Sequence, residues 1–268
     1  MIIADQHMHS VNSPDGRCTI AEMAESAVKK GLKHICLTEH MDMDFPRGIE
    51  LWPELDARRY REEFLQVQEQ FEGRLSMAWG VEYGMQPHLL DRAKEFLNGY
   101  PFDFVIGSGH VTNGQLPTAL EFYRDRPLQD ALWEYFEDLA RNLKLFDDYD
   151  VCGHIDYVVR YCPGQDRDYH YADYAGIMEP LLRTLVEKGK GLEVNSGGLR
   201  YGLREPNPCG AILRKYKELG GEIVTIGSDA HRAGDIALKF DAARELLLDC
   251  GFTRYCVFRE RKPEFLPL

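Results

Sequence analysis

The chain has 268 residues and a formal net charge of −12. Hydrophobic residues make up 44% and charged residues 28% of it, which is the composition of an ordinary globular protein with a sizeable core. The negative charge argues against nonspecific binding to nucleic acid or to an anionic membrane, because both require a basic surface. It does not exclude a phosphorylated substrate, since bound divalent cations reverse the local field of an acidic site.

The cysteine content and the first residues bear on the cellular compartment. The seven cysteines include no Cys-x-x-Cys pair, and the opening MIIADQHMHS lacks the basic and apolar regions of a secretory leader. No apolar run approaches the roughly 18 residues needed to cross a membrane. We therefore expect a cytoplasmic protein with reduced thiols and no membrane partner.

Short apolar runs alternate with longer amphipathic runs along the whole chain. Strands are expected at residues 1–7, 34–40, 75–83, 102–110, 151–159, 191–196 and 222–231, with a terminal strand at 255–260. Helices are expected at residues 19–30, 56–71, 87–97, 129–146, 173–188, 207–219 and 235–248. The first helix begins with the capping box Thr19-Ile-Ala-Glu22, and the helix at 207–219 has Asn207 as its N-cap and Pro208 at its first position.

Seven strand-then-helix units predict a parallel sheet with crossover helices. An open doubly wound sheet and a closed barrel both satisfy this pattern. The number of units and the chain length favour a (β/α)7 or (β/α)8 barrel, and the glycine fingerprints of nucleotide-binding open sheets are missing. We expect residues 1–268 to form a single α/β domain.

Histidines and carboxylates cluster where the predicted strands end. They are His7 and His9 after the first strand, Glu39 and His40 on the second, Glu82 on the third, His110 on the fourth, His154 with Asp156 on the fifth, and Asp229 with His231 on the seventh. The carboxyl ends of barrel strands converge on one face, so we expect these side chains to line one pocket. Imidazole and carboxylate ligands without thiolate suit Zn, Mn or Fe.

Two of these pairs carry a further constraint. In His7-Met-His9 and in Asp229-Ala-His231 the two polar residues are spaced i, i+2, and so lie on the same side of a strand. One such pair, or one histidine near a strand end, is more often structural than metal-binding. The joint pattern over six strands is what predicts a metal site.

The same residues belong to an ordered set of motifs. These are His7-Met-His9, Asp15-Gly, Thr38-Glu-His40, Gly80-Val-Glu82, Gly107-Ser-Gly-His110, Gly153-His154-x-Asp156 and Gly227-Ser-Asp-Ala-His231. The set resembles the PHP (polymerase and histidinol phosphatase) superfamily through nearly the whole chain. Within the superfamily, residues 154–160 (HIDYVVR) and 192–200 (LEVNSGGLR) are similar to segments of the monofunctional histidinol-phosphate phosphatases.

The resemblance implies a distorted (β/α)7 TIM-like barrel with two or three divalent metal ions, Zn, Mn or Fe, at the carboxyl ends of the strands. One ion would be held by His7, His9, Glu82 and Asp229, a second by Glu82, His110 and His154, and a third by Asp15, His40 and His231. Many members carry a histidine where this chain has Asp15, and the stretch Ser13-Pro-Asp-Gly16 also fits a plain turn. An aspartate at this position is compatible with either role.

The resemblance further implies hydrolysis of a phosphomonoester, with L-histidinol phosphate of histidine biosynthesis as the expected substrate. Neighbouring metal ions would lower the pKa of a bridging water, and Glu82, Asp229 and His231 would be the catalytic residues. The proton for the leaving alcohol could come from a metal-bound water, from Asp229 or from His231. The motifs of phosphatases that form a covalent phospho-enzyme, D-x-D-x-T/V after the first strand and C-x5-R, are missing.

Substrate-binding residues are expected in the same loops. Planar donors for the phosphate would come from Arg160 and Arg200, with Arg204 and Arg232 as alternatives. An acid for the ammonium group of the substrate would come from Asp42, or else from Asp44 or Glu205. Trp52 is expected to pack against protein rather than to stack on the substrate.

Other functions are open at the level of sequence. A PHP-type phosphoesterase could act on another small phosphate ester or diester. Amidohydrolases usually carry a lysine as metal bridge on the fourth strand, and residues 102–110 contain none. A scaffold without activity would be expected to lose several ligand positions, whereas this chain keeps all of them. The expected partner is a small phosphorylated molecule and not nucleic acid, and the oligomeric state is not predicted.

Overall fold

The central element of the fold is a sheet of parallel strands. The computed structural model describes residues 1–46, 52–167 and 169–268, and within them seven strands form one sheet in sequence order. They are β1 (Ala4–Asp5), β2 (His34–Met41), β3 (Ser76–Gly84), β4 (Phe104–Ser108), β5 (Val151–Cys152), β6 (Gly191–Asn195) and β7 (Val224–Gly227). Each strand pairs in parallel with the next, so all carboxyl ends face the same way.

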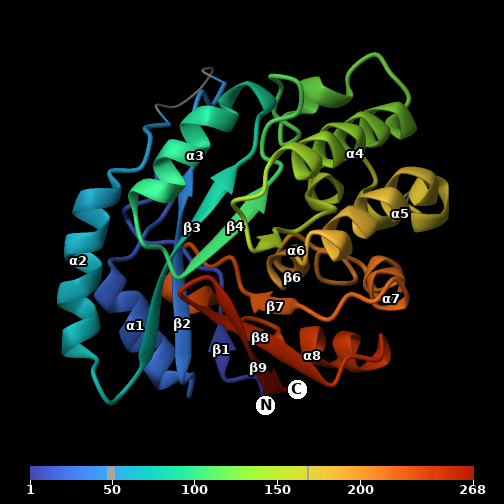
Figure 1. The fold of residues 1–268 in the computed structure, drawn as a ribbon. Coiled ribbons are helices and arrows are strands. Elements are labelled where there is room, and N and C mark those ends of the chain that lie inside the picture. Colours follow the sequence, from blue (N-terminus) through green and yellow to red (C-terminus); the bar gives the residue numbers. More distant parts are fainter. Residues whose placement is uncertain (47–51, 168) are drawn as a thin grey trace.

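The sheet curls until its first and last strands meet. The Gln6 amide donates to the carbonyl of Ile226 at 2.9 Å, and the Asp229 amide donates to the carbonyl of His7 at 2.9 Å. Met8 forms an isolated parallel bridge with Ala230. These contacts bring β1 beside β7 and give the nearly closed (β/α)7 barrel that the alternating pattern predicts (Figure 1).

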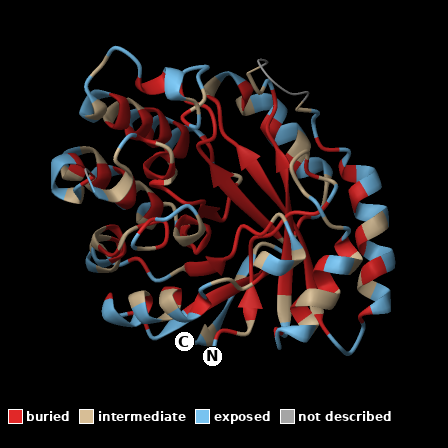
Figure 2. Ribbon diagram, turned by 180° about the vertical axis from the view of Figure 1, so that it is seen from behind, coloured by how far each residue is buried: buried red, intermediate tan, exposed pale blue. Residues whose placement is uncertain are grey.

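Helices follow the strands and cover the outside of the barrel. They are α1 (Ile20–Lys29), α2 (Ala57–Gln70), α3 (Leu90–Gly99), α4 (Leu128–Leu145), α5 (Tyr171–Glu187), the short α6 (Gly197–Arg200), α7 (Gly210–Glu218) and α8 (Phe240–Asp249). The capping box at the start of α1 forms as predicted: Thr19 accepts from the Glu22 amide, and Glu22 accepts from the Thr19 amide. Figure 2 shows buried strands inside and exposed outer faces on the helices.

A C-terminal hairpin fills the end of the barrel at which the strands begin. Its strands are β8 (Arg254–Arg259) and β9 (Lys262–Pro267), which pair antiparallel. The Phe258 ring stacks on that of Phe104, the first residue of β4, at a centroid distance of 4.8 Å. Cys36, Ala78, Ile106, Val151 and Cys256 complete this apolar plug. The opposite end, where the strands stop, is therefore the end available for a site.

Several elements are shorter than the sequence predicts. Strand β1 covers only Ala4–Asp5 of the expected 1–7, and β7 ends at Gly227 instead of residue 231. The strand expected at 151–159 stops at Cys152, and Tyr157–Arg160 form a 3-10 helix (η3), which buries Val158 and Val159 without a sheet partner. The helix expected at 207–219 begins only at Gly210, because the Asn207 side chain bonds to Arg160 and Asp156 instead of capping a helix. The helix expected at 235–248 begins only at Phe240.

Strand β9 was not predicted at all, and its turn explains why. Glu260 and Arg261 at the turn both have positive φ, of 47° and 65°. This backbone is typical of a two-residue hairpin turn, and such turns usually contain asparagine and glycine, by which they can be predicted. Pro263 and Pro267 also weaken the strand signal in the sequence, although proline is tolerated on an edge strand.

Length and polarity of the helices bear on membrane insertion. Within the three described ranges, no helix is both long enough and apolar enough to cross a bilayer.

Candidate metal centre

The nine predicted ligands all lie at the end of the barrel where the strands stop. His40 and Glu82 are neighbours in register on β2 and β3. His110 and His154 follow β4 and β5. The remaining members lie on segments after β1 and β7, namely His7, His9, Asp15, Asp229 and His231. Seven of the nine are at least nine-tenths buried, and Asp15 and His231 are partly exposed.

Glu82 is at the centre of this cluster. Its Oε1 lies 2.9 Å from His154 Nε2 and 3.1 Å from His110 Nε2. Its Oε2 lies 3.1 Å from His7 Nε2, 3.2 Å from His40 Nδ1 and 3.5 Å from His9 Nε2. One carboxylate thus faces two groups of imidazoles, one with each oxygen, which is the geometry of a bridging ligand.

The first group combines His7, His9, Glu82 and Asp229. The two Nε2 atoms of His7 and His9 are 2.9 Å apart. Asp229 Oδ1 lies 3.6 Å from the first and 3.5 Å from the second. Two imidazole nitrogens this close repel each other unless a proton or a cation lies between them.

The second group uses the other oxygen of Glu82. The ligand atoms of Glu82, His110 and His154 all lie within 4.8 Å of one another. The His110 and His154 rings are 5.4 Å apart, with 31° between their planes. Both rings point Nε2 at the same carboxylate oxygen.

The third group lies next to the first. The His9 ring stacks between those of His40 and His231, with centroid distances of 4.2 Å and 4.3 Å. Asp15 lies in a turn, and its carboxylate reaches His231 Nε2 at 3.0 Å and His40 Nε2 at 3.8 Å. Asp15 therefore occupies the turn that its sequence suggests and also faces the histidines predicted to share a metal with it.

A set of outer side chains fixes the imidazole rings. Glu193 on β6 lies 2.5 Å from His7 Nδ1, and Asp42 lies 2.8 Å from His110 Nδ1. Ser13 Oγ lies 3.1 Å from His9 Nδ1 and donates to Glu39. Such partners hold a ring so that its other nitrogen faces the metal.

Glu193 was missed at the level of sequence. It lies in the segment 192–200 that resembles the phosphatases, but as one residue of a buried strand it was given no role. A further signal is that Glu193 and Asn195 share a side of β6, and Asn195 is at the strand end.

The acids predicted for the substrate ammonium lie in different surroundings. Asp42 is 2% exposed and faces His110 and His40, not open space. Asp44 is exposed and pairs with Arg92. Glu205 accepts from the Gly210 amide at the start of α7.

The protonation of the cluster is mixed. Burial acts to lower the pKa values of His7 and His110, but the neighbouring carboxylates hold both well above the ordinary value, so a cation would have to displace a proton there.

Other members of the cluster already have the form that binds a cation. Burial acts to raise the pKa values of Glu82 and Asp229, but the surrounding histidines hold both well below their ordinary values. Burial and the nearby His40 and His231 hold the pKa of His9 well below its ordinary value. Anionic carboxylates and a neutral imidazole are the forms that bind a cation.

Arg160 and Arg200 lie against the cluster. Arg160 is 3% exposed and donates from Nη1 to Asp229 Oδ2 at 2.9 Å, while its buried Nη2 meets no acceptor within the described residues. Arg200 donates from Nη2 to the carbonyl of Asp229 at 2.9 Å. Of the two alternatives, Arg232 lines the same cavity as Arg200 and His231, whereas Arg204 lines a separate one.

That cavity, of about 460 Å³, has three arginines and two aspartates in its lining, and one of the aspartates, Asp235, pairs with Arg200. Besides Arg200 and Arg232 it contains Arg17, which was not singled out from the sequence. Asp15 and His231 connect it to the third group of possible ligands. It offers a cationic path for an anion to the cluster, although the protein as a whole is acidic.

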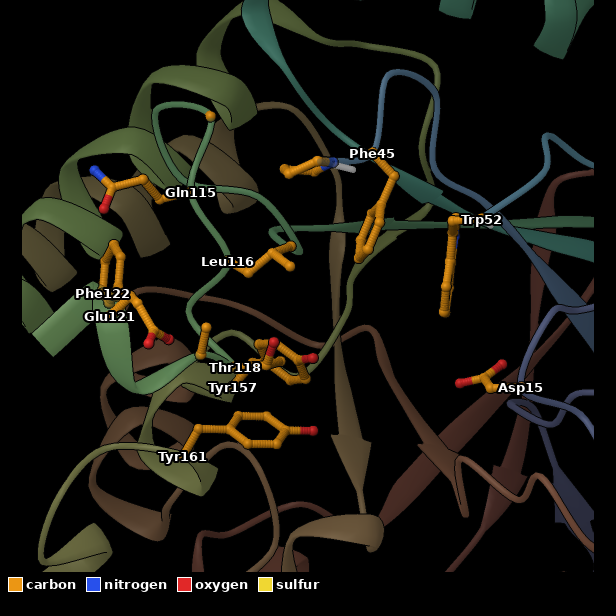
Figure 3. A pocket seen from close by; sticks show the side chains of 13 residues that line it. Asp15, Phe45, Trp52, Gln115, Leu116, Thr118, Glu121, Phe122, Tyr157 and Tyr161 are labelled. Carbon is orange, nitrogen blue, oxygen red and sulfur yellow. The ribbon is translucent and has the colours of Figure 1, made fainter. Parts of the chain in front are cut away.

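A larger cavity of about 620 Å³ opens on the other side of Asp15. Its walls include Phe45, Trp52, Tyr157 and Tyr161, and Figure 3 shows these rings with Asp15 around one space. The Trp52 ring is 5.5 Å from that of His40, and the Tyr157 ring is 4.7 Å from that of His154. Trp52 lines the cavity and also stacks on the Phe45 ring at a centroid distance of 4.6 Å, in agreement with the packing role that the sequence suggested.

The donor set fits divalent metal ions. It consists of imidazole nitrogens and carboxylate oxygens in four overlapping groups of three, and each group is compact enough for one ion. Among the described residues, Asp15 Oδ1 is buried without a hydrogen-bond partner. His40 Nδ1 and His231 Nε2 lie 3.2 Å from Glu82 and 3.0 Å from Asp15, but neither contact has good hydrogen-bond geometry. Buried polar atoms without partners are rare, and a bound cation would account for them.

Relatives of known sequence support a metal-dependent enzyme. The family model of the PHP domain matches residues 5–197. The histidinol-phosphatase of Lactococcus lactis is 31% identical over 96% of this chain and 95% of its own length. The histidinol-phosphatase of Bacillus subtilis is 26% identical over 90% of this chain and 98% of its own length.

Solved structures agree with the sequences. The histidinol phosphate phosphatase of Lactococcus lactis, solved with zinc, L-histidinol and phosphate, superposes with a TM-score of 0.87 at 30% identity, over 97% of this chain and 98% of that one. A protein from Listeria monocytogenes shares the fold, with a TM-score of 0.77 at 20% identity, over 89% of this chain and 98% of that one. The chain belongs to the PHP family.

Proposed function

We propose that this protein hydrolyses L-histidinol phosphate to L-histidinol and inorganic phosphate with the help of divalent metal ions. The observation that carries the proposal is the carboxylate of Glu82, which groups of histidines share. Arg160 bonds to Asp229 of the same cluster, and its Nη2 has no acceptor among the described residues. The relative from Lactococcus lactis, solved with zinc, L-histidinol and phosphate, supports both the chemistry and the substrate.

The metal ions would be two or three in number, with zinc, manganese or iron as candidates. His7, His9, Glu82 and Asp229 would hold one, Glu82, His110 and His154 a second, and Asp15, His40 and His231 a third. When bound, such ions lower the pKa of water and stabilise negative charge on a phosphoryl group. We assign Asp42, Glu193 and Glu39 to holding the histidine rings in place, Glu39 through Ser13.

The protein's own groups complete the site. Arg160 and Arg200 would bind the phosphate oxygens, since a guanidinium offers parallel donors to a dianion. Glu82, Asp229 and His231 are the proposed catalytic residues. His231 is partly exposed and lines the cavity of the three arginines. With only two ions bound, its imidazole would be free to give a proton to the departing alcohol, whereas a third ion on His231 would leave that role to a metal-bound water.

The alcohol part of the substrate would lie in the aromatic cavity. Flat rings such as Trp52 and Tyr157 suit the imidazole of histidinol, which can stack on them. Glu121 is at the wall of this cavity and would provide a carboxylate for the ammonium group in exchange for its exposed ion pair with Arg124. Asp42, the acid first considered for this role, is buried against His110 instead.

The test is steady-state kinetics of the purified protein on L-histidinol phosphate and on a panel of other phosphomonoesters, with and without EDTA. We expect clear preference for L-histidinol phosphate and loss of activity with EDTA that added zinc or manganese restores. Equal, low turnover of all esters would leave a metal-dependent phosphoesterase but remove the named substrate. Activity that survives complete metal removal would contradict the proposal.

A further inference from the structure

Asp156 lies in the motif Gly153-His154-x-Asp156, yet it does not reach the metal cluster. It is 1% exposed, and its two oxygens bond to residues that follow β6. Oδ1 accepts from Asn207 Nδ2 at 2.7 Å, and Oδ2 accepts from the Cys209 amide at 3.0 Å. Both oxygens are therefore anchored by N–H donors, which gives this carboxylate one fixed position.

Asn207 connects Asp156 to Arg160. Its Oδ1 accepts from Arg160 Nε at 2.7 Å, while its Nδ2 donates to Asp156. Arg160 can only donate and the Asp156 carboxylate accepts, so the amide has one orientation that satisfies both neighbours. Asn207 is fully buried, and its backbone pairs in both directions with that of Asn195 at the end of β6.

The space around the Asn207 amide is closed. A Cβ atom added to Gly198 would come within 2.5 Å of Asn207 Oδ1. The absence of a side chain at Gly198 thus lets α6 approach the amide, and the amide has little room to turn. The chain Asp156–Asn207–Arg160 is rigid at every link.

The consequence falls on the guanidinium. Asn207 holds Nε, Asp229 holds Nη1, and the rings of Tyr157 and Tyr201 each lie 5.3 Å from the guanidinium carbon. Nη2 is left as the buried donor without an acceptor in the described part of the chain. With two of its nitrogens held, the guanidinium can aim Nη2 in one direction only.

We propose that Asp156 and Asn207 are positioning residues that fix the guanidinium of Arg160 for the phosphate group. The inference rests on the proposed function, because it takes Arg160 to bind phosphate. Neither residue touches the substrate. Their effect is to present a donor that is already oriented, so that binding phosphate does not first have to order the side chain.

The test uses three variants of the metal-loaded enzyme. Asn207→Asp places a second carboxylate against that of Asp156. Asp156→Asn puts an NH2 group where Asp156 accepted from Asn207 Nδ2, so that two donors face each other. The double variant Asp156→Asn with Asn207→Asp reverses the pair. In it the amide introduced at position 156 would donate to the carboxylate introduced at position 207 and accept from the Cys209 amide. The second oxygen of that carboxylate would accept from Arg160, and the net charge would be unchanged.

We expect each single variant to raise the inhibition constant of inorganic phosphate and the KM for the ester about tenfold, as for a lost hydrogen bond to a charged group. The rise in Tm on adding phosphate should shrink in parallel. The double variant should recover most of both, while metal content stays that of the parent. The matched control is Asp138→Asn in the buried pair Asp138–Asn142 on α4, which should leave phosphate binding unchanged.

Phosphate binding by Arg160→Gln distinguishes failure of the proposed function from failure of the positioning inference. If Arg160→Gln binds phosphate as tightly as the parent, the role of Arg160 in the proposed function is wrong. If Arg160→Gln is weak but the folded Asn207 and Asp156 variants bind phosphate normally, or the double variant shows no recovery, the positioning inference alone is wrong. Where Asn207→Asp does not fold, Asn207→Ala takes its place, because it brings no second carboxylate next to Asp156.

Discussion

The two ends of the barrel are built from the same parallel strands but filled with opposite chemistry. Where the strands begin, Phe258 of the C-terminal hairpin stacks on Phe104 in an apolar plug. Where the strands stop, buried imidazoles and carboxylates surround Glu82. Apolar packing stabilises the fold, whereas a buried polar cluster costs stability unless its charges are compensated. Folding and chemistry are thus assigned to opposite ends, and variants at each end should affect one and not the other.

The largest expected effect is at the polar end. Replacing Glu82 by Gln removes the carboxylate that two groups of histidines share. We expect kcat to fall by on the order of a thousandfold, comparable with loss of the strongest electrostatic contacts in enzyme sites. Kinetics and metal analysis on the folded variant, compared with Glu222→Gln on the surface, measure it. Activity close to that of the parent would break the division between the two ends.

Loss of the plug should have the converse result. Phe258→Ala empties part of a closed apolar contact, and such truncations cost about 3–5 kcal/mol in the free energy of unfolding. KM and metal content of the remaining folded protein should match the parent, since Phe258 is at the far end of the barrel. Denaturant unfolding measures the loss of stability, and steady-state kinetics measures whether KM is unchanged. A changed KM would show that the ends are coupled.

Changing the outer partners of the clustered histidine rings should have an intermediate effect. Glu193→Gln keeps the shape next to His7 Nδ1 but removes the charge that holds the ring. Outer partners of this kind typically contribute a factor of about 10–100 in metal affinity. Competition with a chelator of known affinity measures the change. An unaltered affinity would mean that the backbone alone fixes His7.

The barrel and the gathering of histidines at one end follow from features visible in the sequence, because parallel strands bring their carboxyl ends together. The backbone conformation at Asp229 and His231 could not be predicted in the same way. They were placed on one side of a strand by their spacing, but β7 stops at Gly227 and Asp229 has a φ of +54°. Its position results from the loop and from the amide bond to His7, contacts that no local pattern encodes.

Arg160 shows the same limit. The apolar run before it has strand composition, yet burial of Val158 and Val159 in a 3-10 turn is what places the guanidinium beside Asp229. The roles of the metal ligands and arginines are still predictions, because the proximity of these side chains does not test what each of them binds. The hairpin was unpredictable for another reason: its turn lacks the usual residues and is set by pairing with β8.

The smallest expected effect compares two residues with left-handed backbone, one at each end. Asp229 (φ +54°) is in the cluster and Glu260 (φ +47°) in the hairpin turn. Glu260 can be replaced without touching the cluster. Asparagine tolerates a left-handed backbone better than glutamate does and is preferred in such turns. Glu260→Asn should therefore stabilise the protein by about 0.5 kcal/mol, which corresponds to a Tm increase of roughly 1–2 °C for a chain of this size. Its kcat and KM should not change.

Asp229→Asn also places an asparagine in a left-handed backbone, but it should lower kcat sharply, because it removes the carboxylate from His7 and His9. A gain in stability with parental kinetics at position 260, and a loss of turnover at position 229, would show that the strained turn at the apolar end serves only the fold, whereas that at the polar end is kept for its side chain.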